Sequence, residues 1–91
     1  MKSAYELAME RLEKAAPSLS LTDAQKAEIA EIESIAKART AEKELFLGEQ
    51  IAKARAARDG LALESLEKQL ASERRRIQEE AEVKKERVRR A

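Results

Sequence analysis

Residues 47–70, LGEQIAKARAARDGLALESLEKQL, decide the fold of this chain, because two helix-forming stretches meet there at Asp59-Gly60. Gly adopts the left-handed conformation that ends many helices without steric cost, so this dipeptide predicts a stop and a turn. Ala, Glu, Lys, Arg and Leu dominate on both sides, and charged residues make up 41% of the chain. That composition is typical of long helices and coiled coils.

An eleven-residue repeat of apolar residues runs outward from this turn in both directions. Stepping three, four and four residues from Ile29 to Arg58, and again from Leu63 to Val88, gives twelve apolar residues at seventeen positions, where an overall apolar content of 43% predicts about seven. The two halves mirror each other about the bond between Arg58 and Asp59. We therefore predict an antiparallel helical hairpin, coiled-coil-like and nearly straight. The predicted hairpin seam consists of Ile29, Ile32, Ala36, Leu47, Ile51, Ala54, Leu63, Leu66, Leu70, Ile77, Ala81 and Val88.

Capping signals predict where three helices begin and end. Ser3 with Glu6, and Thr22 with Gln25, have the spacing of a capping box, and Pro17 ends the first helix. The chain is long enough for one domain only. We expect a single all-α domain over residues 1–91, with a short helix over 4–16, a linker over 17–22, a helix over 23–58, a turn at 59–60 and a helix over 61–90.

The short first helix carries an apolar stripe with the spacing of one helical face. The stripe consists of Tyr5, Ala8, Met9, Leu12 and Ala16. The simplest arrangement that buries this stripe folds the first helix back along the second helix, over Ile35. Its length of about 20 Å leaves the tip of the hairpin uncovered.

A second apolar lane on the second helix repeats every eleven residues through Ala24, Ile35, Phe46 and Ala57. Because it is offset from the seam, it requires a neighbour, and the uncovered tip exposes further apolar surface. We predict a homo-oligomer, with a dimer favoured, or a different helical protein as partner. Gly48 allows close approach of a partner helix or is a tolerated weak point. The candidate partner surface is Ile35, Phe46, Gly48 and Ala57.

Lys43 and Arg74 face each other within the predicted seam. Such a like-charge layer could bind an anion or an acidic partner. Alternatively, the aliphatic stems pack while the charges reach the rim and meet Glu44, Glu73 or Gln78.

The second half of the last helix is basic. Its candidate phosphate contacts are Arg74, Arg75, Arg76, Lys84, Lys85, Arg87, Arg89 and Arg90. Lys and Arg on one helix neutralise phosphates, which makes an accessory factor that touches nucleic acid or a ribosome the alternative function. Interleaved glutamates and the lack of aromatic residues nearby favour a solvated helical face instead.

The chain contains no His and no Cys, which removes the usual general bases, thiol nucleophiles and transition-metal ligands. Gly48 and Gly60 are its only glycines, so it has no glycine-rich phosphate loop. We expect no enzymatic activity, cofactor, metal or small-molecule substrate. The sequence lacks a membrane-spanning apolar run and a signal-peptide stretch, and we expect a cytoplasmic protein. The predicted function is structural or adaptor, through helix-mediated self-association or partner binding.

The seam yields a direct test at Leu70, which is expected to face Leu47. Leu70→Asp should unfold or dissociate the protein, because an unpaired carboxylate enters an apolar interface. Loss of helical circular dichroism or of the associated species in light scattering measures this outcome. A variant with unchanged helicity and mass would contradict the predicted seam.

Overall fold

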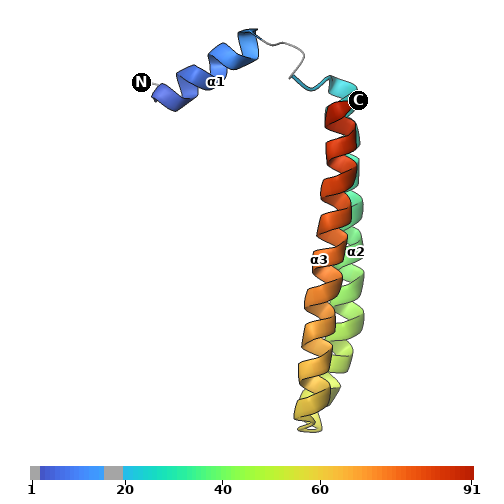
Figure 1. Ribbon diagram of the computed structural model, residues 1–91. Helices are drawn as coiled ribbons and strands as arrows, with labels where there is room; N and C mark the ends of the chain where they lie inside the picture. Colours follow the sequence, from blue (N-terminus) through green and yellow to red (C-terminus); the bar gives the residue numbers. More distant parts are fainter. Residues whose placement is uncertain (1–2, 16–19) are drawn as a thin grey trace.

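The computed structural model describes residues 3–15 and 20–91, and three α-helices account for most of them. The helices are α1 (Ala4–Ala15), α2 (Asp23–Ala56) and α3 (Gly60–Arg90). α2 and α3 run antiparallel and side by side along their whole length, and α1 points away from the open end of this pair (Figure 1). The protein is therefore an all-α helical hairpin preceded by one short helix. The expected helical residue Ala16 and the linker residues 17–19 lie outside the described residues.

Both expected N-terminal caps are present. The Thr22 hydroxyl accepts from the backbone N–H of Gln25 at 3.1 Å, and the Gln25 side chain accepts from the Thr22 N–H at 2.9 Å. This reciprocal pair satisfies two of the donors that the start of α2 leaves open. At α1 the Ser3 hydroxyl accepts from the N–H of Glu6 at 3.2 Å, which is one of the two hydrogen bonds of the expected capping box.

The turn lies where the mirrored pattern predicts it, but Gly60 is not the residue that ends α2. Arg58 adopts the left-handed conformation, with φ of 55°. Its N–H donates to the carbonyl of Arg55 at 3.1 Å, and the N–H of Asp59 donates to that of Ala54 at 3.0 Å. These two bonds form a Schellman motif with Arg58 in the position that usually holds Gly.

Gly60 instead begins α3 and does not have a positive φ. The carboxylate of Asp59 accepts from the N–H of Ala62 at 3.1 Å and so caps α3. The prediction that a left-handed Gly60 forms the turn was wrong. The hydrogen bonds that end α2 are donated by Arg58 and Asp59, so Arg58 takes the left-handed conformation instead. The Asp59 cap begins α3 one residue earlier than expected.

The residues of the predicted seam lie between α2 and α3. Leu47 and Ile77 are 2% exposed, Ala54 and Ala81 are also buried, and the other eight are half-buried. These four residues are the buried apolar core of the hairpin, residues 20–91. A hairpin with one seam has a slender core, because each helix buries only one of its faces.

α1 does not fold back along α2. It contacts neither α2 nor α3 in the described part of the chain, and Tyr5 is 74% exposed (Figure 1). Ile35, which α1 was expected to cover, is 52% exposed. The apolar stripe of α1 predicts that one of its faces is suited to burial, but periodicity within a helix does not determine which surface that face meets.

The turn geometry predicts stabilisation by two substitutions. Arg58→Gly should raise the free energy of unfolding by about 1 kcal/mol, since Gly has no Cβ to strain in the left-handed conformation. Gly60→Ala should also stabilise, by roughly 0.4 to 1 kcal/mol, because added Cβ atoms meet open space and φ is not positive. Urea denaturation measures both, and a destabilising Gly60→Ala would contradict this account of the turn.

Candidate interaction surface

The hairpin has two different edges, one on each side of the seam. One groove between the helices is lined by Glu33, Lys37, Thr40 and Glu44 of α2 and by Gln78 and Lys85 of α3. The groove on the other side is lined by Ile32, Ile35 and Arg39 of α2 and by Ile77 and Lys84 of α3. Ala36 and Ala81 line both grooves, so the two lie back to back across the seam. We call them the charged edge and the apolar edge, and the apolar edge includes Phe46, eleven residues after Ile35.

Ion pairs between α2 and α3 close the charged edge. Glu33, Glu44 and Arg55 recur every eleven residues along α2. Their partners on α3 are Lys85 at 3.3 Å, Arg74 at 2.9 Å and Glu67 at 4.0 Å. Exposed pairs of this kind contribute little stability individually, but their complementary order favours one register of the two helices.

Lys85 is a charged residue within the seam. It is 7% exposed, and its ammonium group lies 2.9 Å from the Glu82 carboxylate as well as near Glu33. The hydrogen bond with Glu82 raises the pKa of Lys85 above its ordinary 10.5 and holds the pKa of Glu82 below its ordinary 4.5. The aliphatic stem packs in the seam, and the charge is satisfied at the edge.

Gln25 makes a contact between α2 and α3 that its position in the sequence did not predict. Its amide oxygen completes the cap of α2, while its nitrogen donates to the carbonyls of Val88 at 3.0 Å and Ala91 at 3.3 Å. One side chain therefore joins the start of α2 to the end of α3. The capping-box spacing identifies the first role, but only the antiparallel arrangement brings the second pair of acceptors within reach.

The pair Lys43 and Arg74 does not form a buried like-charge layer. Both residues are exposed, and the Arg74 guanidinium binds Glu44 at 2.9 and 3.0 Å. The charge of Arg74 therefore meets the Glu44 carboxylate at the rim, which is the charge pairing expected of the alternative interpretation. An anion site between the two would have to displace Glu44.

The apolar edge keeps large hydrophobic side chains in solvent. Ile35 is 52% exposed and Phe46 is 62% exposed. Between them, Arg39 donates to Glu80 of α3 at 2.9 Å, and this bond is the main cause that holds the pKa of Glu80 below its ordinary 4.5. Ala24 and Ala57, at the two ends of the lane, are exposed as well. Among the described residues, this edge has one cross-helix ion pair, whereas the charged edge has three such ion pairs.

Gly48 does not share the apolar edge with Phe46. Two residues of helix correspond to about 200° of rotation, so Gly48 lies on the opposite side of α2. It is one turn beyond Glu44 on the charged edge, and a Cβ built there meets no atom within 4 Å. Grouping Gly48 with the partner surface relied on proximity in sequence, which does not place two residues on one helical face.

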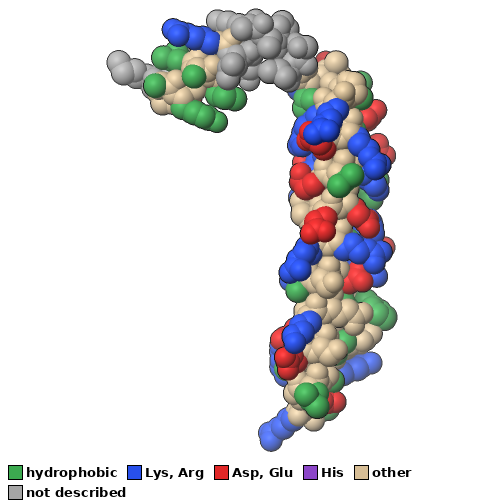
Figure 2. Space-filling view, in the orientation of Figure 1, with side chains coloured by type: hydrophobic (Ala, Val, Ile, Leu, Met, Phe, Trp, Pro, Cys, Tyr) green, Lys and Arg blue, Asp and Glu red, His purple; other side chains and the backbone are tan. Residues whose placement is uncertain are grey.

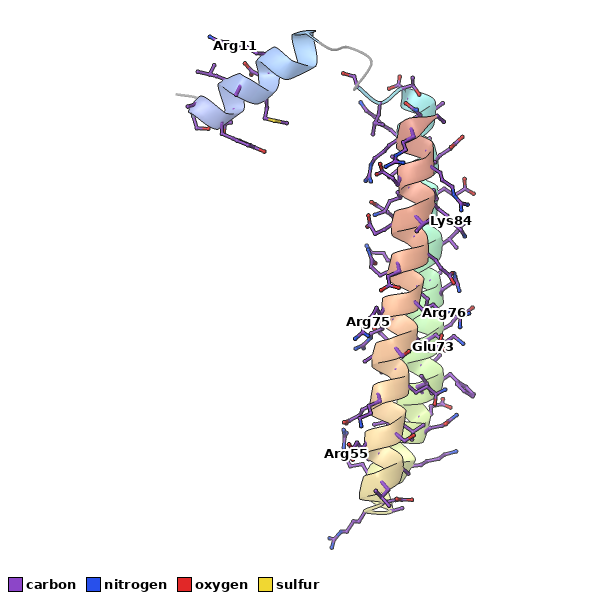
Figure 3. The ribbon with its side chains drawn as sticks, viewed as in Figure 1. Arg11, Arg55, Glu73, Arg75, Arg76 and Lys84 are labelled. Carbon is purple, nitrogen blue, oxygen red and sulfur yellow. The ribbon has the colours of Figure 1, made fainter. Side chains whose placement is uncertain are left out.

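The candidate phosphate contacts on α3 are largely engaged with carboxylates. Arg74, Arg76, Lys85, Arg89 and Arg90 each form an ion pair with a glutamate. Figure 3 shows that the neighbours Arg75 and Arg76 leave α3 on different sides. On the face shown in Figure 2, blue and red side chains alternate along the hairpin rather than forming a basic stripe. Nucleic-acid binding therefore remains a prediction from sequence.

Comparison with known proteins adds no family to these observations. The chain matches no protein-family model, and it has no significant similarity to a curated protein or to a solved structure. Among the described residues, no three carboxylates come together as a metal site, and none of the described helices has the length and hydrophobicity needed to cross a bilayer.

The ion pairs predict a dependence of stability on pH. Glu80 and Glu82 contribute stability that is complete above 4.5 and is lost as the pH falls through their lowered pKa, because the unfolded chain then binds protons first. The Lys85 contribution is complete below 10.5 and is lost as the pH rises through its raised pKa. Thermal unfolding followed across this range measures both losses.

Lys85→Met should remove the loss of stability that deprotonation of Lys85 causes at high pH. The loss of stability that protonation of Glu80 causes at low pH should remain. The matched control is Lys84→Met, which changes an exposed neighbour and should leave the alkaline loss in place. Equal alkaline behaviour of the two variants would contradict the role assigned to Lys85.

Proposed function

We propose that this protein is a non-catalytic self-association module whose apolar edge binds a second copy of the chain. The observation that carries the proposal is the exposure of Ile35 and Phe46 on the one edge that ion pairs leave largely open. Complete burial of a fully exposed side chain of this kind gains about 1.5 to 3 kcal/mol, and Ile35 and Phe46, at 52% and 62% exposed, would gain somewhat more than half of that. A symmetrical dimer would bury these side chains in both copies, so this free energy would contribute twice.

The small core supports the same proposal. Leu47, Ile77, Ala54 and Ala81 are the buried apolar residues of the described hairpin, and Ala contributes little apolar area. Chains of this size with so slender a core commonly gain stability by oligomerisation. Covering the apolar edge would add Ile35 and Phe46 to the buried set without disturbing the charged edge.

Other exposed apolar residues do not offer a comparable surface. Leu45 is 70% exposed and Leu61 is 84% exposed, but Ser34 lies eleven residues before Leu45 and Ser72 lies eleven residues after Leu61, so a polar residue interrupts the repeat beside each. Single exposed hydrophobic residues are normal on protein surfaces. The recurrence of apolar residues at one position of the eleven-residue repeat distinguishes the apolar edge from them.

Light scattering over a concentration series tests the proposal. The protein should pass from monomer to dimer as its concentration rises, and its thermal midpoint should rise in parallel, because association stabilises the folded state by mass action. A monomer at every concentration would overturn the proposal.

Phe46→Gln identifies the surface. It should weaken the dimer by about two orders of magnitude, since both copies lose the burial of one aromatic side chain. The matched control is Leu45→Gln, which alters an equally exposed neighbour about 100° away around α2 and should leave the dimer unchanged. Equal effects of the two substitutions would place the interface elsewhere.

A further inference from the structure

We infer that the segment of the second copy that covers the apolar edge is α1, so that two chains exchange their first helices. This inference rests on the proposed self-association and specifies its geometry. Each α1 would lie along Ile35 and Phe46 of the other chain, making a three-helix layer on each hairpin. The occupant is thus a defined segment of this protein.

The first argument is that α1 has no packing partner of its own. It is 12 residues long and contacts neither α2 nor α3 within the described residues. Isolated helices shorter than about 12 to 15 residues are marginal in water, because few hydrogen bonds offset the cost of nucleation. A helix of this length is therefore stabilised mainly by the surface against which its apolar face packs.

The second argument is that α1 presents such a face. Tyr5 is 74% exposed and Met9 is 41% exposed, and four residues separate them, which places them one turn apart on the same side. The hydroxyl of Ser3 caps the start of this helix. The face is therefore presented on a helix with a defined beginning, and neither α2 nor α3 contacts this helix in the described part of the chain.

The third argument is a match of length and charge. Ile35 and Phe46 are separated by about 16 Å along α2, and α1 is about 18 Å long. On the α3 side, Val83 is 52% exposed in a groove lined by Arg76, Lys84 and Arg87 together with Glu79 and Glu80. α1 carries Glu6 in its first turn, so an acidic position of α1 would meet a groove in which cations outnumber carboxylates by three to two.

The choice of a second copy over the same chain follows from the position of α1. It extends away from the open end of the hairpin rather than lying along it (Figure 1). An element that is extended in one chain and complementary to an open surface of the same protein is suited to exchange between two chains. Reciprocal exchange closes the assembly at two copies, because each chain's α1 covers the apolar edge of the same chain that covers its own.

Cross-linking between single-cysteine variants of the 91-residue chain tests this geometry, since the chain has no cysteine. Ala8→Cys in an isotopically labelled copy is mixed with Glu42→Cys in an unlabelled copy and treated with a short bis-maleimide. Glu42 lies two turns after Ile35 and one turn before Phe46, and it is exposed. The matched control is Lys37→Cys, which is exposed on the charged edge.

The yield of cross-linked product between a labelled and an unlabelled chain should be about tenfold or more higher with Glu42→Cys than with Lys37→Cys. The reason is that docking raises the local concentration of the reacting pair of cysteines. Equal yields from the two positions, while light scattering still shows a dimer, would overturn the exchange of α1 and leave the proposed self-association standing. A monomer in light scattering would overturn both.

A double variant with Ala8→Cys and Glu42→Cys in one chain separates exchange from folding back. Products within a single chain, without products between chains, would show that α1 packs on its own hairpin and would overturn the inference. In addition, Tyr5→Gln with Met9→Gln should weaken the dimer by a factor comparable to that of Phe46→Gln. An unchanged dimer in that variant would also overturn it.

Discussion

The contact between α2 and α3 along a single eleven-residue seam is the constraint on which the rest of the structure depends. Leu47 and Ile77 are nearly inaccessible, and small residues such as Ala36 and Ala81 allow the two helices to approach closely. Because eleven residues make only slightly more than three turns of an α-helix, the seam stays on one face with little supercoiling. Two helices of more than 30 residues therefore remain in register over their whole length.

This seam also explains why the two edges differ. In an antiparallel pair, the positions on one side of the seam in α2 always meet the corresponding side of α3. The side that contains Glu33 and Glu44 meets Lys85 and Arg74 and forms ion pairs. The other side contains Ile35 and Phe46, whose neighbours on α3 do not cover them. The apolar edge is thus a consequence of the same repeat that builds the core.

The predictions from sequence succeeded where the determining signal was repeated many times. The hairpin and the position of its bend depended on twelve apolar positions, so an error at one residue had little effect. The conformation of Arg58 depended on a single residue and was missed, because Asp59-Gly60 carried the stronger local signal for a turn. The second role of Gln25 was missed for a related reason, since its acceptors lie more than 60 residues away in the chain.

Local sequence patterns determined that this chain forms three helices and that two of them pair about Arg58 and Asp59. Periodicity encodes which face of a helix is apolar, and caps encode where a helix begins, because both depend on residues within a few turns. Only the tertiary structure decided that Lys85 is buried with its charge satisfied and that α1 leaves the hairpin. These properties depend on which surfaces meet in space, and a pattern within one helix carries no information about the surface that lies opposite.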